Sequence, residues 1–177
     1  LPNGVWVKPP YCADPVMYVH PAADTVPALE AVEETVVVVK TRLMSNPTLY
    51  AVGGQDGAKS FSSVERYDEE KDRWKIAASM NSVRCYLGVC VLNGRMYAVG
   101  GRDEDDKYMS SVERYDEEKD QWEIVASMHF ERRFLAVCVL NGRIYAVGGA
   151  DDDEEPLSSV ERYDEEKDQW ESVASMN

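Results

Sequence analysis

The string SSVERYDEEKD occurs three times, at Ser62–Asp72, Ser110–Asp120 and Ser158–Asp168, and its copies start 48 residues apart. A fixed period of this length indicates stacked supersecondary units, each of which buries its apolar faces only against a neighbour. Repeat folds of this kind display surface loops for binding more often than they enclose a catalytic pocket. The string therefore predicts a repeat protein and favours an interaction function over catalysis.

Two further marks recur in register with this string. A Gly-Gly pair precedes each copy, and a Trp follows each copy two residues later. The marks are Gly53-Gly54, Gly100-Gly101, Gly148-Gly149, Trp74, Trp122 and Trp170. Between Gly-Gly and Ser-Ser the first unit has Gln55–Phe61, one residue fewer than Arg102–Met109 in the second. Because length changes are tolerated in surface connections, this stretch is predicted to be a loop.

Each unit reads as four short strands. In the second unit these are Cys85–Leu92, Arg95–Gly100, Ser111–Asp116 and Gln121–Ala126. The first two are joined by Asn93-Gly94, the strongest short hairpin signal, because both turn residues need positive φ. The third unit repeats the pattern over Phe134–Leu140, Arg143–Gly148, Ser159–Asp164 and Gln169–Ala174. The runs are too short and too interrupted by Gly to be helices.

Four antiparallel strands per unit fit one blade of a β-propeller. The Gly-Gly pairs suit the crowded strands near a propeller axis, and Tyr115 and Trp122 are expected to fill the space between neighbouring blades. We therefore expect an all-β fold with blades at about 35–80, 81–128 and 129–177. Thr35–Thr41 is predicted to be a strand that could supply the inner strand missing from the first blade.

The first 34 residues do not follow the repeat and are interpreted as a non-repeat segment, a candidate linker. Six of the eight Pro residues fall between Pro2 and Pro27, and Pro27–Glu34 suits one or two helical turns. Neither a signal peptide nor a transmembrane run is recognisable, which favours a cytoplasmic or nuclear location, of which the cytoplasm is the first expectation. The repeat-equivalent Cys90 and Cys138 are expected to be buried, reduced thiols.

The pattern RMYAVGG…SSVERYDEEKDQW, together with its RIYAVGG and LYAVGG versions, resembles the kelch repeat, and the resemblance covers about Leu49–Asn177. It is similar above all to the kelch domain of BTB-kelch proteins. The resemblance implies a β-propeller that captures a substrate for a cullin-3 ubiquitin ligase; the regions that would bind the cullin are absent from this chain. An alternative within the family is binding or cross-linking of filamentous actin.

Three units are fewer than the four to eight blades of a closed propeller. The chain is therefore interpreted as a fragment, or as half of a ring that self-associates with a partner copy. A lone arc of three blades would leave two apolar blade faces open. The net charge of −14 makes nucleic acid and anionic membranes unfavourable partners and is compatible with a basic protein partner.

The connections between the predicted strands form two sets. The Asn-Gly turns and the DEEKD turns leave one end of the blades and are nearly identical between units. The Gly-Gly loops leave the other end and read QDGAKSF, RDEDDKYM and ADDDEEPL; the blade-to-blade loops at the same end read NSVR and HFERR. Because varied loops on a rigid scaffold usually carry recognition, partner binding is expected at this second end.

Within these loops, the first candidates for contacting a partner are one Tyr and the acidic residues: Asp103, Asp105, Asp106, Tyr108, Asp151, Asp152, Asp153, Glu154 and Glu155. The second candidates are Arg84, His129, Phe130, Arg132 and Arg133. The repetition of Arg84 at Arg132 favours a structural role for both. Tyr108 and Phe130 are either binding hot spots or packed loop anchors.

Catalytic and ligand sites are not expected in this chain. The acidic run Asp151–Glu155 lacks the spaced oxygens and the Gly of a calcium loop, so no metal is predicted. With two His residues and no P-loop or Ser-His-Asp set, neither a cofactor nor an enzymatic activity is predicted. The sequence thus favours a protein-interaction module.

Overall fold

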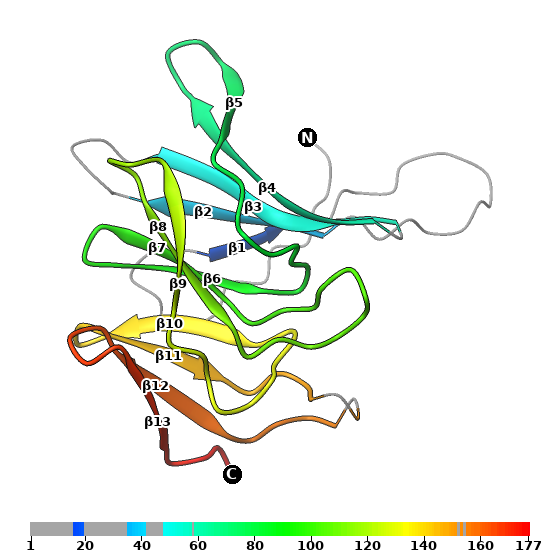
Figure 1. The fold of residues 1–177 in the computed structure, drawn as a ribbon, viewed down its shortest axis with the longest axis vertical. Helices are drawn as coiled ribbons and strands as arrows, with labels where there is room; N and C mark the ends of the chain where they lie inside the picture. The colour runs from blue at the N-terminus through cyan, green and yellow to red at the C-terminus, as the bar shows by residue number, and fades with distance from the viewer. Residues whose placement is uncertain (1–15, 20–34, 42–47, 58, 152, 154) are drawn as a thin grey trace.

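The computed structural model describes residues 16–19, 35–41, 48–57, 59–151, 153 and 155–177. In this part of the chain all regular structure is β-strand, arranged as three antiparallel sheets that stack one beside the next (Figure 1). No helix in the described ranges is long and apolar enough to cross a membrane. The predicted all-β fold of propeller blades is confirmed, and the arc formed by the described blades is not closed into a ring.

Blade 1 is a five-stranded sheet with the strand order β1-β2-β3-β4-β5. Its strands are β1 (Val16–Val19), β2 (Thr35–Thr41), β3 (Thr48–Asp56), β4 (Lys59–Asp68) and β5 (Arg73–Ala77). The prediction that 35–41 adds a strand inside β3 is confirmed, because β2 pairs antiparallel with β3. The sequence did not indicate β1, which adds one more strand beyond β2.

Blades 2 and 3 are four-stranded sheets whose strands follow chain order. Blade 2 comprises β6 (Gly88–Leu92), β7 (Arg95–Val99), β8 (Val112–Asp116) and β9 (Gln121–Val125). Blade 3 comprises β10 (Ala136–Leu140), β11 (Arg143–Val147), β12 (Val160–Asp164) and β13 (Gln169–Val173). All eight strands lie within the predicted runs and are slightly shorter.

The Asn-Gly turns form the expected tight hairpins. Asn93 and Gly94 have φ of 50° and 74°, and Leu92 pairs with Arg95 directly across the turn. Asn141 and Gly142 adopt the same geometry in blade 3, with φ of 51° and 73°. Two consecutive positive φ values match the right-handed twist of the flanking strands, so each turn fixes the register of its hairpin.

The prediction of a loop at Gln55–Phe61 is wrong. In blade 1 the strands β3 and β4 continue through this stretch, and Asp56 pairs with Lys59. The physical reason is the shorter connection, which closes as a tight hairpin through Gly57 at φ 55° instead of spanning an open loop. The predicted helical turns at 27–34 lie outside the described residues.

Large rings fill the space between blades, as predicted. Tyr115 and Trp122 of blade 2 pack with Tyr50, Val52 and Met80 of blade 1 in one apolar cluster. Tyr163 and Trp170 of blade 3 join a second cluster with Tyr97, Val99 and Met128 of blade 2. The equivalent Trp74 is 42% exposed, against 7% for Trp122 and 6% for Trp170. Blade 1 has no described sheet on that side, so its Trp lacks the contacts that bury the other two.

The two repeat-equivalent thiols differ in burial. Cys90 is buried in the cluster between blades 2 and 3. Cys138, predicted to be buried, is only half-buried, because no described sheet lies on that side of blade 3.

A buried ion pair holds each of the later blades together. The Arg84 and Glu113 side chains are both fully buried, with 3.1 Å between Nη2 and Oε1. Arg84 also donates to the carbonyl oxygens of Gly100 and Ser111, both at 2.9 Å, and to Ser111 Oγ at 2.8 Å. Burial lowers the pKa of the Arg84 guanidinium, while the charge of Glu113 opposes this shift. Every guanidinium N–H thus has an acceptor, the condition under which a buried charge is tolerated.

Glu113 completes the network from the other side. Its carboxylate accepts hydrogen bonds from the backbone amides of Asn81 and Ser82, at 2.6 and 3.0 Å, which fixes the start of the blade-to-blade loop. Blade 3 repeats the arrangement with Arg132 and Glu161, also 3.1 Å apart and fully buried. In blade 1 the equivalent Glu65 is exposed. The ion pair is therefore a property of blades 2 and 3 in the described part.

The Gly-Gly pairs allow a close approach between backbones. A Cβ at Gly101, where φ is 100°, would lie 2.6 Å from the carbonyl oxygen of Cys85. The Gly101 amide donates to the carbonyl oxygen of Arg132 at 2.8 Å, which links blade 2 to the loop entering blade 3. Only Gly combines this φ with this proximity, so the pair serves both the bend of the chain and the junction between blades.

We predict that Glu113→Ala lowers the free energy of unfolding by about 3–5 kcal/mol, because it leaves the buried Arg84 guanidinium without its counter-ion. Glu65→Ala, the same substitution at the equivalent exposed position, should change it by less than about 0.5 kcal/mol. Urea unfolding followed by circular dichroism measures both. Equal shifts for the two variants would show that the buried pair has no special structural role.

A second pair of variants separates steric clash from backbone strain. Gly101→Ala and Gly142→Ala both place a Cβ at positive φ, but a Cβ at Gly142 meets no atom within 4 Å. We expect Gly101→Ala to be the more destabilising of the two by about 1–3 kcal/mol, the usual cost of overpacking. Similar thermal midpoints for both variants would contradict this assignment.

Candidate functional site

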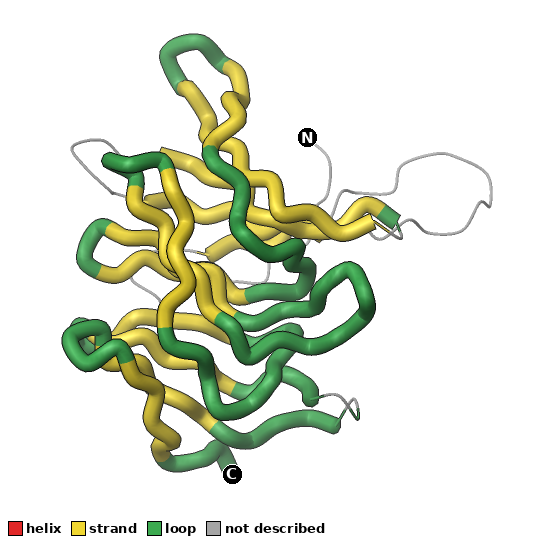
Figure 2. The backbone as a smooth tube through the Cα atoms, viewed as in Figure 1, coloured by secondary structure: helices red, strands yellow, loops and turns green. Residues whose placement is uncertain are grey.

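The structure gathers the varied loops at one end of the blades, named here the loop face. It comprises the Gly-Gly loops, described at 102–109 and at 150–151, 153 and 155–157, and the blade-to-blade loops 81–87 and 129–135. Backbone bridges join Cys85 to Arg102 and Arg133 to Ala150, so each Gly-Gly loop lies against a blade-to-blade loop. The long loops and the short turns lie on opposite sides of the blades (Figure 2). The predicted grouping of the connections into two sets is confirmed.

The first acidic loop is held by one of its own carboxylates. Asp103 Oδ1 accepts hydrogen bonds from the amides of Asp105 and Lys107, both at 2.9 Å. Asp106 forms an ion pair with Arg102 at 2.8 Å, and Asp105 lies 3.8 Å from Lys107 Nζ. The Asp105 and Asp106 side chains are 72% and 78% exposed. Asp103 therefore shapes the loop, while the other two point to solvent with partly neutralised charge.

The second acidic loop repeats this shape with a different charge. Asp151 Oδ1 accepts from the amides of Asp153 and Glu155, both at 3.1 Å. Asp153 and Glu155 are exposed. The predicted candidates Asp152 and Glu154 lie outside the described residues. Asp151 is thus the structural equivalent of Asp103, and the exposed carboxylates follow it.

Formal charge rises in magnitude along the three Gly-Gly loops. QDGAKSF carries one acid and one base and is neutral, RDEDDKYM carries four acids and two bases for −2, and ADDDEEPL carries five acids for −5. The four-stranded scaffold beneath the second and third loops is the same, whereas the first stretch belongs to the hairpin of β3 and β4 in blade 1. Blade 3 therefore presents the strongest negative potential of the loop face, which would attract a basic partner.

Two of the predicted binding residues are not on the surface. Arg84 and Arg132 are fully buried, and each pairs with a Glu inside its own blade. Their proposed role as partner contacts is corrected accordingly, because a side chain without exposed area cannot reach another protein in this structure. The geometry supports a structural role for both Arg84 and Arg132.

Aromatic rings and guanidinium groups form a second feature, named here the aromatic–arginine cluster: Tyr86, Arg102, Tyr108, Arg133 and Phe134. The Tyr86 and Phe134 rings lie 4.3 Å apart between centroids. Arg133 stacks over Tyr108 at 4.3 Å and over Phe134 at 5.0 Å, and Arg102 stacks over Tyr86 at 5.0 Å. The cluster joins blades 2 and 3 beside the acidic loops and presents an apolar and cationic surface.

Two members of this cluster have unusual backbone conformations. Tyr86 and Phe134 have φ of 55° and 53°, a region that bulky residues rarely adopt. The Phe134 amide donates to the carbonyl oxygen of Tyr86 at 3.0 Å, and Phe134 stays 56% exposed. Backbone strain of this kind is held only where the surrounding structure imposes it, and it is common at binding sites.

The sequence reasoning missed Tyr86, Arg102 and Phe134. Tyr86 and Phe134 stand at repeat-equivalent positions 48 residues apart, two residues before the inner strands begin, and the sequence pattern includes them in the apolar strand runs. The recurrence of an aromatic residue just outside a strand was the available signal. Of the predicted aromatics, Tyr108 is 9% exposed and packed under Arg133, whereas Phe130 is 46% exposed.

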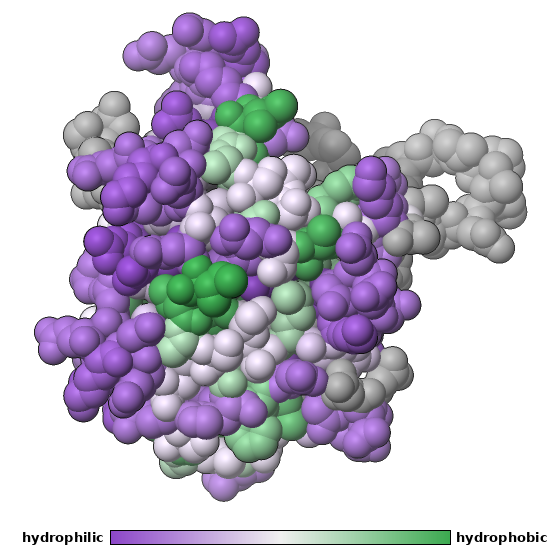
Figure 3. Space-filling view, viewed as in Figure 1, coloured by the Kyte–Doolittle hydropathy of each residue, from purple (hydrophilic) through white to green (hydrophobic). Residues whose placement is uncertain are grey.

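His129 and Phe130 lie at the rim of the loop face. The backbone amides of both residues donate to the Glu161 carboxylate, at 2.7 and 3.2 Å, and His129 Nδ1 lies 2.8 Å from Glu161 Oε2. The buried ion pair thus also sets the position of this rim. In the view of Figure 3, polar side chains cover both the turns and the loops, and apolar side chains gather between them, including over β9.

The repeat geometry, the Gly-Gly bends and the ring-filled junctions define a β-propeller-type repeat module. The chain matches the sequence model of the Kelch motif over residues 44–81, 84–129 and 131–177. This match covers most of the chain, and the protein belongs to the kelch-repeat family.

Curated relatives match over single stretches of the chain. Human "Kelch-like protein 3" is 45% identical over 58 residues, which are 33% of this chain and 10% of the relative. "Kelch repeat and BTB domain-containing protein 2" of horsepox virus is 36% identical over 61 residues, 34% of this chain and 11% of the relative. Mouse "Kelch-like protein 8" is 46% identical over 59 residues, 33% of this chain and 9% of the relative. The matched part is about a tenth of each relative's length.

A solved structure shares the fold. The chain in "Structure of YjhT" superposes with a TM-score of 0.68 at 14% sequence identity, over 90% of this chain and 59% of the other. At this identity the likeness shows the fold alone. The three described blades therefore correspond to a part of a larger propeller.

We predict that Asp103→Ala loosens the first acidic loop, because the amides of Asp105 and Lys107 lose their acceptor. Hydrogen exchange read by NMR should show faster exchange at these two amides, with the strand amides of β7 and β8 unchanged. Asp105→Ala removes an equal charge without removing that acceptor and should leave both amides protected. Unchanged exchange in Asp103→Ala would contradict the structural role given to this carboxylate.

Proposed function

We propose that this kelch module is the partner-recognition propeller of a BTB-kelch adaptor for a cullin-3 ubiquitin ligase, and that its loop face binds a basic protein segment. The observation that carries the proposal is the contrast between the two ends of the blades. The turns repeat with almost no change, whereas the loops of blades 2 and 3 differ in sequence and charge above the same four-stranded scaffold. Kelch domains generally bind proteins, and varied loops on a fixed frame are suited to that role.

The acidic side chains support the choice of a basic partner. Asp153 and Glu155 are exposed at the tip of the loop with the highest negative charge, and the whole chain carries −14. A surface of one sign raises the rate of encounter with a partner of the other sign, and this effect weakens as salt screens it. Binding should therefore become weaker as ionic strength rises.

The aromatic residues of the loop face offer apolar surface that a bound partner could bury, which charged side chains do not provide. Phe130 and Phe134 are 46% and 56% exposed, and interface hot spots are enriched in aromatic and Arg side chains. In this proposal the acidic tips orient the partner, and the exposed rings, with Arg133, provide the buried centre of the contact. Catalysis, a metal and a cofactor have no part in it.

The adaptor part of the proposal rests on the relatives. Matches to the kelch-like proteins, and to a protein named for kelch repeats and a BTB domain, support membership of that group. In this group the propeller captures the substrate and a separate region binds the cullin. We therefore place substrate capture in this chain, cullin binding outside residues 1–177, and the protein in the cytoplasm.

The test is affinity capture from cell extract, compared between variants and identified by mass spectrometry. We expect the wild-type chain to retain a protein with a basic segment and the double variant Asp153→Ser/Glu155→Ser to lose it by about tenfold or more in dissociation constant. The matched control is Glu118→Ser/Glu166→Ser, which removes the same charge from exposed positions on the DEEKD turns.

Equal loss in both double variants would indicate a general charge effect and refute the choice of the loop face. Retention by all variants would refute the acidic tips as the contact. The actin alternative is measured separately by co-sedimentation with filamentous actin. Co-sedimentation that depends on Asp153 and Glu155 would replace the adaptor proposal with the structural one.

A further inference from the structure

The aromatic–arginine cluster is a continuous stack of planar groups on the loop face. Arg102 lies 5.0 Å over the Tyr86 ring, and the centroid of that ring is 4.3 Å from the centroid of Phe134. Arg133 lies over the Phe134 ring at 5.0 Å and over the Tyr108 ring at 4.3 Å. Three loops of blades 2 and 3, at 81–87, 102–109 and 129–135, contribute these residues. Tertiary contacts between the two blades therefore form the stack.

The two backbone bridges each supply one guanidinium group to the stack, in opposite ways. Cys85 bridges Arg102 in blade 2, and at the equivalent positions 48 residues later Arg133 bridges Ala150. The Arg thus stands on the Gly-Gly loop in blade 2 and on the blade-to-blade loop in blade 3. What recurs between the blades is the stacked cation, although its position in the repeat changes.

The charges around the cluster favour a neutral aromatic group over an ion. A guanidinium group already lies over each of the three rings, so a further cation would meet like charges there. An anion would meet an Arg102 that already pairs with Asp106 at 2.8 Å, between loops of formal charge −2 and −5. The negative face of an aromatic ring is attracted both to guanidinium groups and to the positive edges of other rings. Phe134, which is 56% exposed, adds apolar surface for such a ring to cover.

The acidic tip of blade 3 lies within reach of the same short partner segment. Phe134 follows Arg133, whose bridge to Ala150 joins two backbones about 5 Å apart. Asp153 lies beyond Ala150 by a stretch of chain that spans at most about 11 Å. The path from Phe134 to Asp153 is therefore no longer than about 20 Å, which an extended chain covers in about six residues.

We propose that the loop face recognises an extended partner segment in which one aromatic side chain lies within about six residues of a run of Lys or Arg. The aromatic side chain stacks on Phe134 and its neighbours in the cluster, and the basic side chains reach Asp153 and Glu155. This inference rests on the proposed function, to which it adds the aromatic residue of the partner and its spacing from the basic run.

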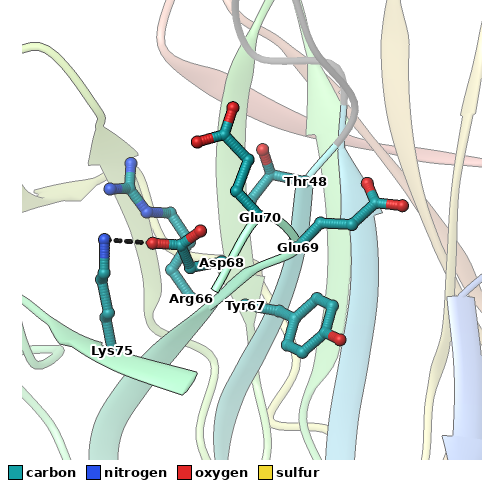
Figure 4. A pocket seen from close by; sticks show the side chains of 7 residues that line it. All are labelled: Thr48, Arg66, Tyr67, Asp68, Glu69, Glu70 and Lys75. Atoms are coloured by element: carbon teal, nitrogen blue, oxygen red, sulfur yellow. Dashed lines mark ion pairs between the residues drawn. The ribbon is translucent and has the colours of Figure 1, made fainter. Parts of the chain in front are cut away.

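A hollow of about 540 Å³ at the DEEKD turn of blade 1 provides an internal comparison (Figure 4). Its lining consists mainly of polar side chains: Thr48, Arg66, Tyr67, Asp68, Glu69, Glu70 and Lys75. Lys75 pairs with Asp68, whereas Glu69 and Glu70 are exposed and point in other directions. A basic peptide can approach these two carboxylates by charge alone, and the aromatic–arginine cluster lies at the opposite end of the blades. Contact at this hollow should therefore not depend on an aromatic residue in the peptide.

The experiment titrates synthetic peptides into the isotope-labelled 177-residue chain and follows amide chemical shifts by NMR. The probe peptide carries one Trp and a Lys-Arg-Lys run, separated by about three Ser or Gly residues. Two comparison peptides replace the Trp by Ala or by Glu. We expect the Trp peptide to bind at least about threefold more tightly than the Ala peptide, because an aromatic contact contributes this much or more, and the Glu peptide to bind most weakly.

The same spectra locate the contact. The Trp peptide, and not the Ala peptide, should shift the amides of Tyr86 and Phe134, because a stacked indole ring changes the local field at both. Shifts at Glu69 and Glu70, beside the hollow of blade 1, should be the same for the two peptides. This readout uses the unmodified chain and so does not depend on how well any variant folds.

A variant tests the ring directly. Phe134→Asn removes the ring and introduces a residue type that tolerates the positive φ of 53° at this position. It should bind the Trp and Ala peptides equally, with the affinity for the Ala peptide unchanged. Ile124→Asn, at an apolar side chain that is 69% exposed on β9, is the matched control and should keep the preference for Trp. Far-UV circular dichroism checks that both variants are folded.

Three results would overturn this inference. They are equal affinities for the Trp and Ala peptides, a preference for Trp that survives Phe134→Asn, and tighter binding of the Glu peptide, which would mean that the cluster selects an anion. The double variant Asp153→Ser/Glu155→Ser separates these failures from failure of the proposed function. If it weakens binding of the Ala peptide, the acidic tips stand as a contact even when the aromatic preference is absent. If it binds every peptide as the unmodified chain does, the acidic tips are refuted and this inference fails with them.

Discussion

The buried ion pair between Arg84 and Glu113 is the constraint on which the rest of blade 2 depends. One guanidinium group contacts the bend at Gly100 and the strand entry at Ser111, while the carboxylate holds the amides that begin the blade-to-blade loop. Because both charges are removed from water, each missing contact would be costly, and the three segments must keep their relative positions. The same network in blade 3, around Arg132 and Glu161, sets the rim of the loop face at His129.

Internal repetition made most of the fold predictable. It located the strands of blades 2 and 3, the tight Asn-Gly hairpins and the rings between blades, because these features depend on local pattern and recur in register. Repetition favours a structural role for Arg84 and Arg132, but it does not show that both side chains are fully buried, so the two residues also stood among the second candidates for partner contact. The hairpin at Gln55–Phe61 was missed because one lost residue changes the closure of a turn, which a comparison of lengths does not reveal.

The candidate site was predicted in its location more than in its chemistry. Sequence variation indicated the acidic loops, but it did not show that their carboxylates have different roles. Asp103 and Asp151 accept hydrogen bonds from amides of their own loops and so hold the loop conformation. The side chains that face solvent are those of Asp105, Asp106, Asp153 and Glu155. The stacking of Tyr86, Phe134 and Arg133 depends on two backbone positions at positive φ. Such a conformation is imposed by packing from two blades and leaves little trace in composition.

The junction between blades 1 and 2 and the junction between blades 2 and 3 use nearly the same contacts. This similarity affects how the folding chain brings its blades into the correct order. Glu117 and Glu165 receive the same kinds of donor, so the chemistry of a junction does not distinguish one blade from another. During synthesis a blade meets several surfaces that it could join equally well, and repeat proteins are prone to misassembly for this reason. What specifies the sequence of blades is the covalent tether, residues 78–87 and 126–135, which makes the correct neighbour the nearest one. The linear order of this protein is thus encoded in its linkers and not in its interfaces.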